Sequence, residues 1–399
     1  MRIPHPLTTR ILRRWVFGAL SILAIAPVLY FTACSSGGDS GGGTPPPSTP
    51  PPSSGGSTAN QFAYVIASGA SEIQAFSLDN SGNLTKIGGS IATGVFPHHV
   101  DVDRAGRFVY VSNHDSSFVS GWRINSDGSL DPINPAIGSP VTTDVNPHSS
   151  VIDQTGNFLY VLSGTGASTL RAYTIDTTTG ATRGMPTAIT GQSFPVGTHG
   201  HNVTISPNNQ FIYVAAQDSG EVFAFSRDTT TGMLTAQGSV NGLPTCDAVA
   251  VSPDNKFLYA AYTNAVEAFS IGANGALTRI TPVSAFSTNN NGQGSGPHSM
   301  TIHPNGQTLY TANINANTVS VFRVDTNTGV LTEVPPPPAT GAFPNYVLVH
   351  PNQLFLYTAD AGPSALSRFA INSDGTLVAP ATVISNTGLG SNGIGTTKF

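Results

Sequence analysis

The chain has 399 residues and a formal net charge of −5, and only 9% of its residues are charged, against roughly 25% in an average soluble domain. Its 43 glycines and 30 prolines favour turns over long helices. This composition excludes a helical bundle or a coiled coil, and the absence of a Lys/Arg cluster outside the N-terminus excludes a basic nucleic-acid-binding protein.

The first 33 residues have the layout of an export signal. Arg10, Arg13 and Arg14 precede an apolar run over residues 15–33, as a positive region precedes a hydrophobic one in such signals. The run ends in Phe-Thr-Ala-Cys at residues 31–34, which resembles the lipobox of bacterial lipoproteins. The resemblance implies that residues 1–33 are a signal peptide and that Cys34 is lipidated, so that the protein is exported and anchored to the bacterial cell envelope. The alternative is a retained membrane anchor, because the run is about long enough to span a bilayer.

Residues 34–60 consist almost entirely of Gly, Ser, Pro and Thr. They contain too little apolar material to fold, so they predict a flexible tether. Cleavage after residue 33 would remove four arginines and leave 12 basic against 21 acidic residues, a net charge of −9. A chain with this charge avoids anionic surfaces, so we expect contact with the membrane only through the N-terminal lipid anchor, and no nucleic-acid partner.

Residues 61–399 contain one unit seven times, with an aromatic strand in each copy. The strands carry a tyrosine at intervals of 46 to 53 residues: Tyr64, Tyr110, Tyr160, Tyr213, Tyr259, Tyr310 and Tyr357. A turn glycine follows the next strand of each copy: Gly82, Gly128, Gly180, Gly232, Gly275, Gly329 and Gly375. Four short strands per period predict an all-β, seven-bladed β-propeller with four-stranded antiparallel blades. Residues 392–399 look like the strand that the first repeat lacks, so the C-terminal strand is expected to join the N-terminal blade and close the ring.

Two motifs in these repeats carry a family resemblance. Tyr-Thr-Ala-Asn at residues 310–313, followed by Val-Ser-Val-Phe at residues 319–322, resembles the YVTN-repeat propellers. Together with the Pro-His pairs that end at His148 and His298, the pattern resembles the seven-bladed lactonase family, which includes 6-phosphogluconolactonases and muconate cycloisomerase-like enzymes. The resemblance implies hydrolysis of a sugar or other lactone at the mouth of the central channel.

One position, twelve residues before each repeated tyrosine, is polar throughout. It is occupied by His98, His148, His201, Asp247, His298 and Asn345, with Asn392 as the expected seventh member. This is where each innermost strand begins, so the propeller brings these side chains around one axis. The loop after each repeated tyrosine should open on the same face, and it carries His114, Asp115 and Asp218.

The chemistry of a lactonase suits this ring of side chains. A histidine can act as general base on the water that opens a cyclic ester, because its pKa lies near neutrality. We expect His148 or His298 in this role, with Asp247 orienting the base. The other ring and loop residues are then expected to bind the substrate's hydroxyl groups.

Other interpretations of the ring stay open. Several histidines could ligate a metal, with His199 and His201 facing the same way, although the ligands would come from separate blades and no cofactor is expected. The ring could also be merely solvated, in a non-catalytic, envelope-displayed propeller that binds a glycan or a protein. His303 and His350 occupy a repeated turn position and are expected to serve the turn.

The basic residues bear on the substrate. Neither Lys nor Arg falls in the ring or its loops, and Arg104 lies in a turn on the opposite face. Phosphate recognition normally uses such residues, so the sequence favours an uncharged or weakly charged lactone over a sugar phosphate. We expect the protein to be a monomer.

Overall fold

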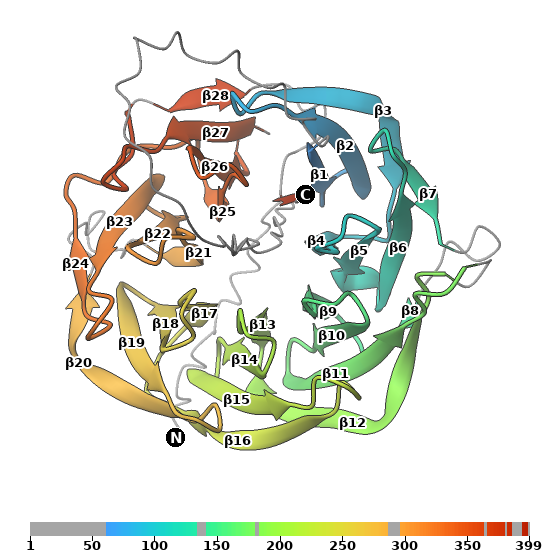
Figure 1. The fold of residues 1–399 in the computed structure, drawn as a ribbon, viewed down its shortest axis with the longest axis horizontal. Helices are drawn as coiled ribbons and strands as arrows, with labels where there is room; N and C mark the ends of the chain where they lie inside the picture. The colour runs from blue at the N-terminus through green and yellow to red at the C-terminus, as the bar shows by residue number, and fades with distance from the viewer. Residues whose placement is uncertain are drawn as a thin grey trace, which may run out of the picture.

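The computed structural model describes residues 61–133, 141–179, 183–285, 296–362, 365–379, 381–384 and 393–397. They form seven antiparallel sheets around a central axis (Figure 1), so the predicted seven-bladed propeller is confirmed. Within these residues the only helical element is a single 3-10 turn, η1(His114–Ser116), and no helix is long and apolar enough to cross a membrane. The expected signal peptide, Cys34, the tether and Asn392 lie outside the described residues.

The first four blades follow the chain from the N-terminus. Blade 1 contains β1(Gln61–Ala67), β2(Glu72–Leu78), β3(Leu84–Ala92) and β29(Gly393–Thr396). Blade 2 contains β4(Pro97–Val102), β5(Phe108–Asn113), β6(Phe118–Ile124) and β7(Leu130–Pro132), with the short β8(Val141–Thr142) also paired to β6. Blade 3 contains β9(Pro147–Ile152), β10(Phe158–Ser163), β11(Ala167–Ile175) and β12(Pro186–Thr198). Blade 4 contains β13(Gly200–Ile205), β14(Phe211–Ala216), β15(Glu221–Arg227) and β16(Leu234–Val240).

In each of the last three blades the four strands follow the chain from the channel outward. Blade 5 contains β17(Cys246–Val251), β18(Phe257–Tyr262), β19(Ala265–Ile271) and β20(Leu277–Ala285). Blade 6 contains β21(Pro297–Ile302), β22(Thr308–Asn313), β23(Thr318–Val324) and β24(Leu331–Glu333). Blade 7 contains β25(Pro344–Val349), β26(Phe355–Asp360), β27(Ala365–Ala370) and β28(Thr382–Ile384).

The hydrophobic core lies between neighbouring blades. The second strand of a blade is packed on both faces, and every residue of β5, β10 and β14 is buried. Two-sided burial explains why these strands read as continuous apolar and aromatic runs rather than as alternating patterns. Side chains of adjacent blades share single clusters, such as the one that joins Tyr160 and Leu162 of blade 3 to Ile212 and Val214 of blade 4.

Blade 1 closes the ring with strands from both ends of the chain. β29 pairs with β1 in antiparallel register, with Gly395 opposite Tyr64. The amide of Phe62 donates to Thr397 Oγ1 at 2.8 Å, and the amide of Thr397 donates to the carbonyl of Phe62. The expected closure by the C-terminal strand is therefore confirmed.

The repeated tyrosines bond each blade to the next. Six of the seven buried hydroxyls donate to the carbonyl of a turn glycine in the following blade, as Tyr64 does to Gly128 at 3.1 Å. Equivalent bonds run from Tyr110 to Gly184, Tyr160 to Gly232, Tyr213 to Gly275, Tyr310 to Gly375 and Tyr357 to Gly82. The Tyr259 hydroxyl, in blade 5, has no hydrogen-bond partner among the described residues.

The turn glycines are required for two reasons. Gly128 has φ = 84°, a region that disfavours side chains, and a Cβ there would lie 2.3 Å from the ring of Phe62. In blade 3 the carbonyl of Gly184 accepts the bond from Tyr110. The sequence spacing predicts Gly180 as the turn glycine of this blade, and Gly180 lies outside the described residues. The longer hairpin of blade 3 moves the contact four residues along the chain, which a count of residues cannot detect.

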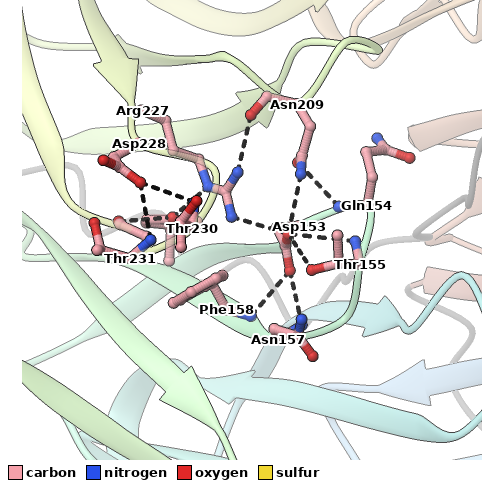
Figure 2. A network of polar contacts seen from close by, with 12 residues as sticks. Asp153, Gln154, Thr155, Asn157, Phe158, Asn209, Arg227, Asp228, Thr230 and Thr231 are labelled. Carbon is pink, nitrogen blue, oxygen red and sulfur yellow. Dashed lines mark hydrogen bonds and ion pairs between the residues drawn. The ribbon is translucent and has the colours of Figure 1, made fainter.

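A buried ion pair joins the turn after β9 of blade 3 to the end of β15 of blade 4 (Figure 2). Asp153 and Arg227 are both fully buried, and Nη2 of Arg227 lies 2.9 Å from Oδ2 of Asp153. The same carboxylate accepts the amides of Asn157 and Phe158, and Arg227 also donates to the Tyr160 hydroxyl at 2.6 Å. Every polar group of the pair has partners, so the desolvation cost of both charges is offset.

Removal of one partner of this pair should destabilise the propeller. Arg227→Met leaves the Asp153 carboxylate buried without its counter-charge, so we expect a loss of about 3–5 kcal/mol in the free energy of unfolding. The matched control is Arg323→Met, which breaks a half-exposed pair with Asp374 and should cost less than about 1 kcal/mol. Chemical denaturation of both variants measures the difference, and equal losses would contradict the assignment.

Asp360 sits where two other blades have an asparagine. In blade 6, Asn313 accepts from Thr311 and donates to Ser320. In blade 7, Asp360 accepts from Thr358, from Ser367 and from the amide of Gly341. Burial raises the pKa of Asp360 to about 6. Asp360 is fully buried, and its bonds to Thr358 and Ser367 lie within its own blade.

Asp360→Asn should therefore stabilise the protein at high pH. A carboxyl with a raised pKa in the folded state weakens the fold once it ionises, so the cost is present above about pH 6 and disappears as the pH falls toward 4. We expect a gain of about 1–3 kcal/mol at pH 8 and none at pH 4, measured by denaturant unfolding. A variant less stable than the wild type at pH 8 would contradict this account.

Candidate active site

The innermost strand of each blade presents one unpaired backbone edge to the channel. Imidazoles of the preceding blade satisfy its carbonyls: in each case Nδ1 bonds to the carbonyl oxygen of the residue at the same repeat position in the next blade. The bonds run from His98 to His148 (3.1 Å), from His148 to His201 (2.9 Å), from His201 to Asp247 (2.8 Å) and from His298 to Asn345 (3.1 Å).

These bonds fix the tautomer of the four imidazoles. A carbonyl oxygen only accepts, so Nδ1 must carry the hydrogen, and in the neutral ring Nε2 is then left with its lone pair. Within the described residues no protein group bonds to any of the four Nε2 atoms. All four Nε2 atoms are therefore potential hydrogen-bond acceptors, and two of the four imidazoles, His201 and His298, line the cavity.

A second set of bonds satisfies the amides of the same strands. The side chain one residue further along accepts from an amide of the next blade: Val203 N donates to Ser149 Oγ (3.4 Å), Val249 N to Asn202 Oδ1 (3.2 Å) and Val347 N to Ser299 Oγ (3.4 Å). Asn202 is also a lining residue of the cavity, and its amide nitrogen remains a donor that Val249 does not use.

The imidazoles pack against one another in the order of the blades. The ring centroids of His98 and His148 are 3.7 Å apart, those of His148 and His201 4.5 Å, and those of His201 and His298 4.7 Å. Burial is the main cause that lowers the pKa of all four, and neighbouring imidazoles lower it further in each case. The contacts of His201 and His298 with Asp247 act in the opposite direction. The pKa falls to about 3 for His201 and to about 4 for His298, so the cluster is neutral at pH 7.

Asp247 interrupts the ring of imidazoles. Its carboxylate cannot donate to the carbonyl of His298 as a histidine would, and it accepts instead from Nε2 of Gln217. Burial raises the pKa of Asp247 to about 6, while His298 and the bond from Gln217 act to lower it. Asp247 is thus the ring member that changes charge close to neutral pH.

A cavity of about 430 Å³ runs along the inner strands. His201, Asp247 and His298 line one end of it, and the turns that follow the inner strands line the other, among them Arg104, Gln154 and Asn208. The half-buried or exposed state of these turn residues shows that the cavity reaches the surface on the turn face. The sequence predicts a pocket only at the mouth where the inner strands begin, and the structure extends this pocket along the strands to the turn face.

The loop residues form a rim around the imidazoles. Nδ1 of His114 lies 2.6 Å from Oδ1 of Asp115, and the His114 ring lies 5.7 Å from that of His148. On the other side, His199 lies 5.5 Å from His148, and its Nδ1 is 3.6 Å from Oδ1 of the exposed Asp218. The fold thus brings His114 and His199 to the cluster, whereas Asp115 and Asp218 face outward behind them.

The structure therefore gathers most of the side chains that the repeat position predicts. His98, His148, His201, His298 and Asp247 are brought together, and Asn345 joins them through its carbonyl. Asn392 lies outside the described residues. Among those residues, no group of three or more His, Cys, Asp or Glu side chains is arranged to hold a metal ion.

Sequence reasoning missed a second polar group in the channel wall. Nδ1 of His99 lies 3.3 Å from Oδ2 of Asp101, and Ser150 Oγ donates to the same oxygen at 2.5 Å. Tyr346 also lines the cavity, and burial, with the charge of Asp101, raises the pKa of its hydroxyl. These residues occur in single blades, so a search for positions shared by all repeats could not find them.

His303 and His350 serve turns, as predicted. Nδ1 of His303 accepts from the amide of Asn305, and Nε2 of His303 bonds to the carbonyl of Gln353 in the next blade. His350 does the same with Asn352 and with the carbonyl of Asp79.

Comparisons with known proteins agree with this architecture. The model of a family described as "Lactonase, 7-bladed beta-propeller" matches residues 56–147, 144–246, 235–339 and 288–395. A candidate 6-phosphogluconolactonase from Bacteroides fragilis is 19% identical, with a TM-score of 0.70 over 87% of this chain and 100% of that one. The periplasmic gluconolactonase PpgL of Pseudomonas aeruginosa is 18% identical, with a TM-score of 0.69 over 85% and 99% of the two chains. The comparison with curated proteins gave no match.

The buried imidazoles predict a loss of stability in mild acid. Their pKa values are lowered in the folded state, so below about pH 6.5 the unfolded chain binds protons that the folded protein refuses. Asp247 and Asp360, whose pKa values are raised to about 6, oppose this trend, but the four ring imidazoles and His350 outnumber them. We expect the free energy of unfolding to fall between pH 6.5 and pH 4.5, by about 1.4 kcal/mol per pH unit for each uncompensated histidine.

Denaturant unfolding at several pH values measures this slope. His350→Asn removes the one of these five histidines that lies outside the channel, and it should make the slope shallower. A free energy of unfolding that is constant or rises between pH 6.5 and pH 4.5 would contradict the neutral state of the ring.

Proposed function

The chain belongs to the seven-bladed β-propeller lactonase family, and we propose that it hydrolyses a lactone in its central channel, at Asp247 and His298. The observation that carries the proposal is the interruption of the ring. Each of the four ring histidines bonds to a backbone carbonyl of the next blade. Asp247 makes no such bond, and it lines the cavity with a pKa of about 6.

Asp247 is the general base in this proposal. Its carboxylate takes a proton from a water molecule, whose oxygen forms a bond to the lactone carbonyl carbon. The ring C–O bond then breaks, and the proton passes to the alkoxide that leaves, which gives the open hydroxy acid. A base is most effective when its pKa lies near the working pH, and this condition favours Asp247 over the imidazoles.

The base therefore differs from the one that the sequence suggested. His148 and His298 were expected to be the base, but an imidazole whose pKa is lowered to about 4 or further has little affinity for a proton. The ring imidazoles instead offer Nε2 lone pairs, which accept hydrogen bonds from hydroxyl groups. The nitrogen of the Asn202 amide is the donor that would polarise the lactone carbonyl.

This division of roles fits a polyhydroxylated lactone. A sugar-derived lactone carries several hydroxyl donors, and His201 and His298 offer acceptors in the cavity, with His98 and His148 next to them in the ring and His114 at its rim. The names of the similar solved structures, a candidate 6-phosphogluconolactonase and a periplasmic gluconolactonase, support an aldonolactone as the first substrate to test.

One observation favours a second function. The imidazole bonds close the edges of the inner strands, so the ring has a structural reason to exist without catalysis. In that case the Nε2 acceptors would bind hydroxyl groups of a glycan, or the face would bind a protein, without turnover. The protein would then be a binding propeller displayed at the cell envelope, to which the N-terminal sequence would anchor it through Cys34 in either function.

Replacement of Asp247 tests the proposal. We expect Asp247→Asn to reduce kcat/KM toward a responsive aldonolactone by about 10²–10⁴-fold, because the amide cannot accept a proton. For the wild type, activity should be present above pH 6 and fall as the pH drops through about 6, since the base must be ionised. Lactone hydrolysis is followed by pH-stat titration of the acid produced.

The matched control is Asp325→Asn, which alters an exposed turn carboxylate on the outer strands and should leave kcat/KM unchanged. Thermal unfolding of both variants verifies that they are folded. The proposal is wrong if no aldonolactone or aromatic lactone is hydrolysed faster than in buffer, or if Asp247→Asn keeps wild-type activity. Saturable binding of an oligosaccharide without turnover would support the binding function.

A further inference from the structure

The cavity has a second polar end, far from Asp247. The inner strands are six residues long, so at about 3.3 Å per residue the turn face lies about 20 Å from the imidazoles. The residues that line this turn end are Arg104, Gln154, Pro207, Asn208, Pro253, Asn255 and Pro304. Among the described lining residues, Arg104 is the only one with a positively charged side chain.

Arg104 is not neutralised by a carboxylate. Its Nη1 donates to Oε1 of Gln154 at 2.8 Å, and no ion pair with an acidic side chain of the described residues is present. The two acidic residues of the wall nearest in sequence have other partners: Asp101 accepts from Ser150, and Asp153 pairs with Arg227. A guanidinium has five N–H donors, so most donors of Arg104 are not used by Gln154.

The neighbouring arginine shows the contrast. Arg107, in the same turn, lies 2.6 Å from Asp103 and also donates to the carbonyl of Thr155. Arg107 is therefore used to join the turns of blades 2 and 3. Arg104 is half-buried at the cavity mouth, and burial lowers its pKa because no counter-charge compensates.

Gln154 is fixed by a backbone hydrogen bond and contacts Arg104 through its side chain. Its backbone amide donates to Asn209 Oδ1 at 3.0 Å, and Asn209 belongs to the Asp153–Arg227 network. Figure 2 shows the Gln154 side chain directed away from that network. The buried ion pair thus fixes the turn, while the amide of Gln154 bonds to the guanidinium of Arg104.

We infer that Arg104, positioned by Gln154, is an anion-binding subsite at the turn-face mouth of the channel, and that it takes a carboxylate or phosphate group of a small ligand. Guanidinium groups bind both through paired N–H donors. The wall around it is otherwise neutral or already paired, and Asp247 at the far end repels anions. A ligand with one anionic end would therefore bind with that end toward the turn face.

The subsite gains a role in turnover if the proposed function holds. Lactone hydrolysis creates a carboxylate next to Asp247, and Arg104 would attract this product toward the turn face, where the cavity opens. The absence of basic residues from the imidazole ring, which argued for an uncharged substrate, then applies to only one end of the channel. This role rests on the proposed function, whereas anion binding itself does not.

Binding of two probes tests the inference. Isothermal titration of the purified full chain with inorganic phosphate and with gluconate, at low ionic strength, should give saturable binding of at least one of them. Arg104→Met should weaken that binding at least tenfold, and Arg104→Lys should restore it only partly, because a lysine lacks the paired donors. The control Arg323→Met removes a charge from the outer strands and should bind as the wild type does.

The outcomes separate this inference from the proposed function. Asp247→Asn should retain anion binding even when turnover is lost, and binding that depends on Arg104 would stand even if no lactone is hydrolysed. The affinities for phosphate and for gluconate show whether the subsite prefers a phosphate or a carboxylate group. The inference is overturned if the wild type binds neither probe, or if Arg104→Met, folded by thermal unfolding, binds with wild-type affinity.

Discussion

A propeller blade leaves the edge of its innermost strand facing the channel, and the unpaired C=O and N–H groups of that edge must find partners. In this protein the preceding blade provides them, through imidazole Nδ1–H groups for the carbonyls and through Ser or Asn oxygens for the amides. Farther from the axis, the bonds from tyrosine hydroxyls to glycine carbonyls also connect each blade to the next. The channel is therefore built by contacts between blades.

The chemistry of the candidate site follows from this constraint. Bonds to carbonyls fix the imidazoles in one tautomer and bury them, and burial keeps them neutral. A row of neutral acceptors suits hydroxyl groups but not proton abstraction. Asp247 departs from the pattern at one blade, and the same burial that lowers the pKa of the imidazoles raises that of its carboxyl. Burial thus has opposite effects on the two kinds of group: it leaves the imidazoles as neutral acceptors for hydroxyl groups, and it brings the pKa of Asp247 into the range of a general base.

Much of the fold could be predicted from the sequence because the repeat makes it redundant. Seven tyrosines at near-regular intervals define the blades, and counting twelve residues back from each of the last six identifies the described members of the ring. Features of single blades could not be predicted in this way: His99 with Asp101 and Ser150, Arg104 at the far mouth, and Gly184 in a longer hairpin. The pKa values depend on burial, which becomes known only when the blades are packed together, and for this reason we propose Asp247 rather than a histidine as the base.

The measurement that tests the account most directly is ¹⁵N NMR of the histidine side chains in the intact protein. At pH 7 the account predicts that His98, His148, His201 and His298 are neutral, with the hydrogen on Nδ1 and a lone pair on Nε2, and that they stay neutral at pH 5. Resonances that show the hydrogen on Nε2, or imidazoles that become protonated near pH 6.5, would contradict the claim that these side chains close the inner strands.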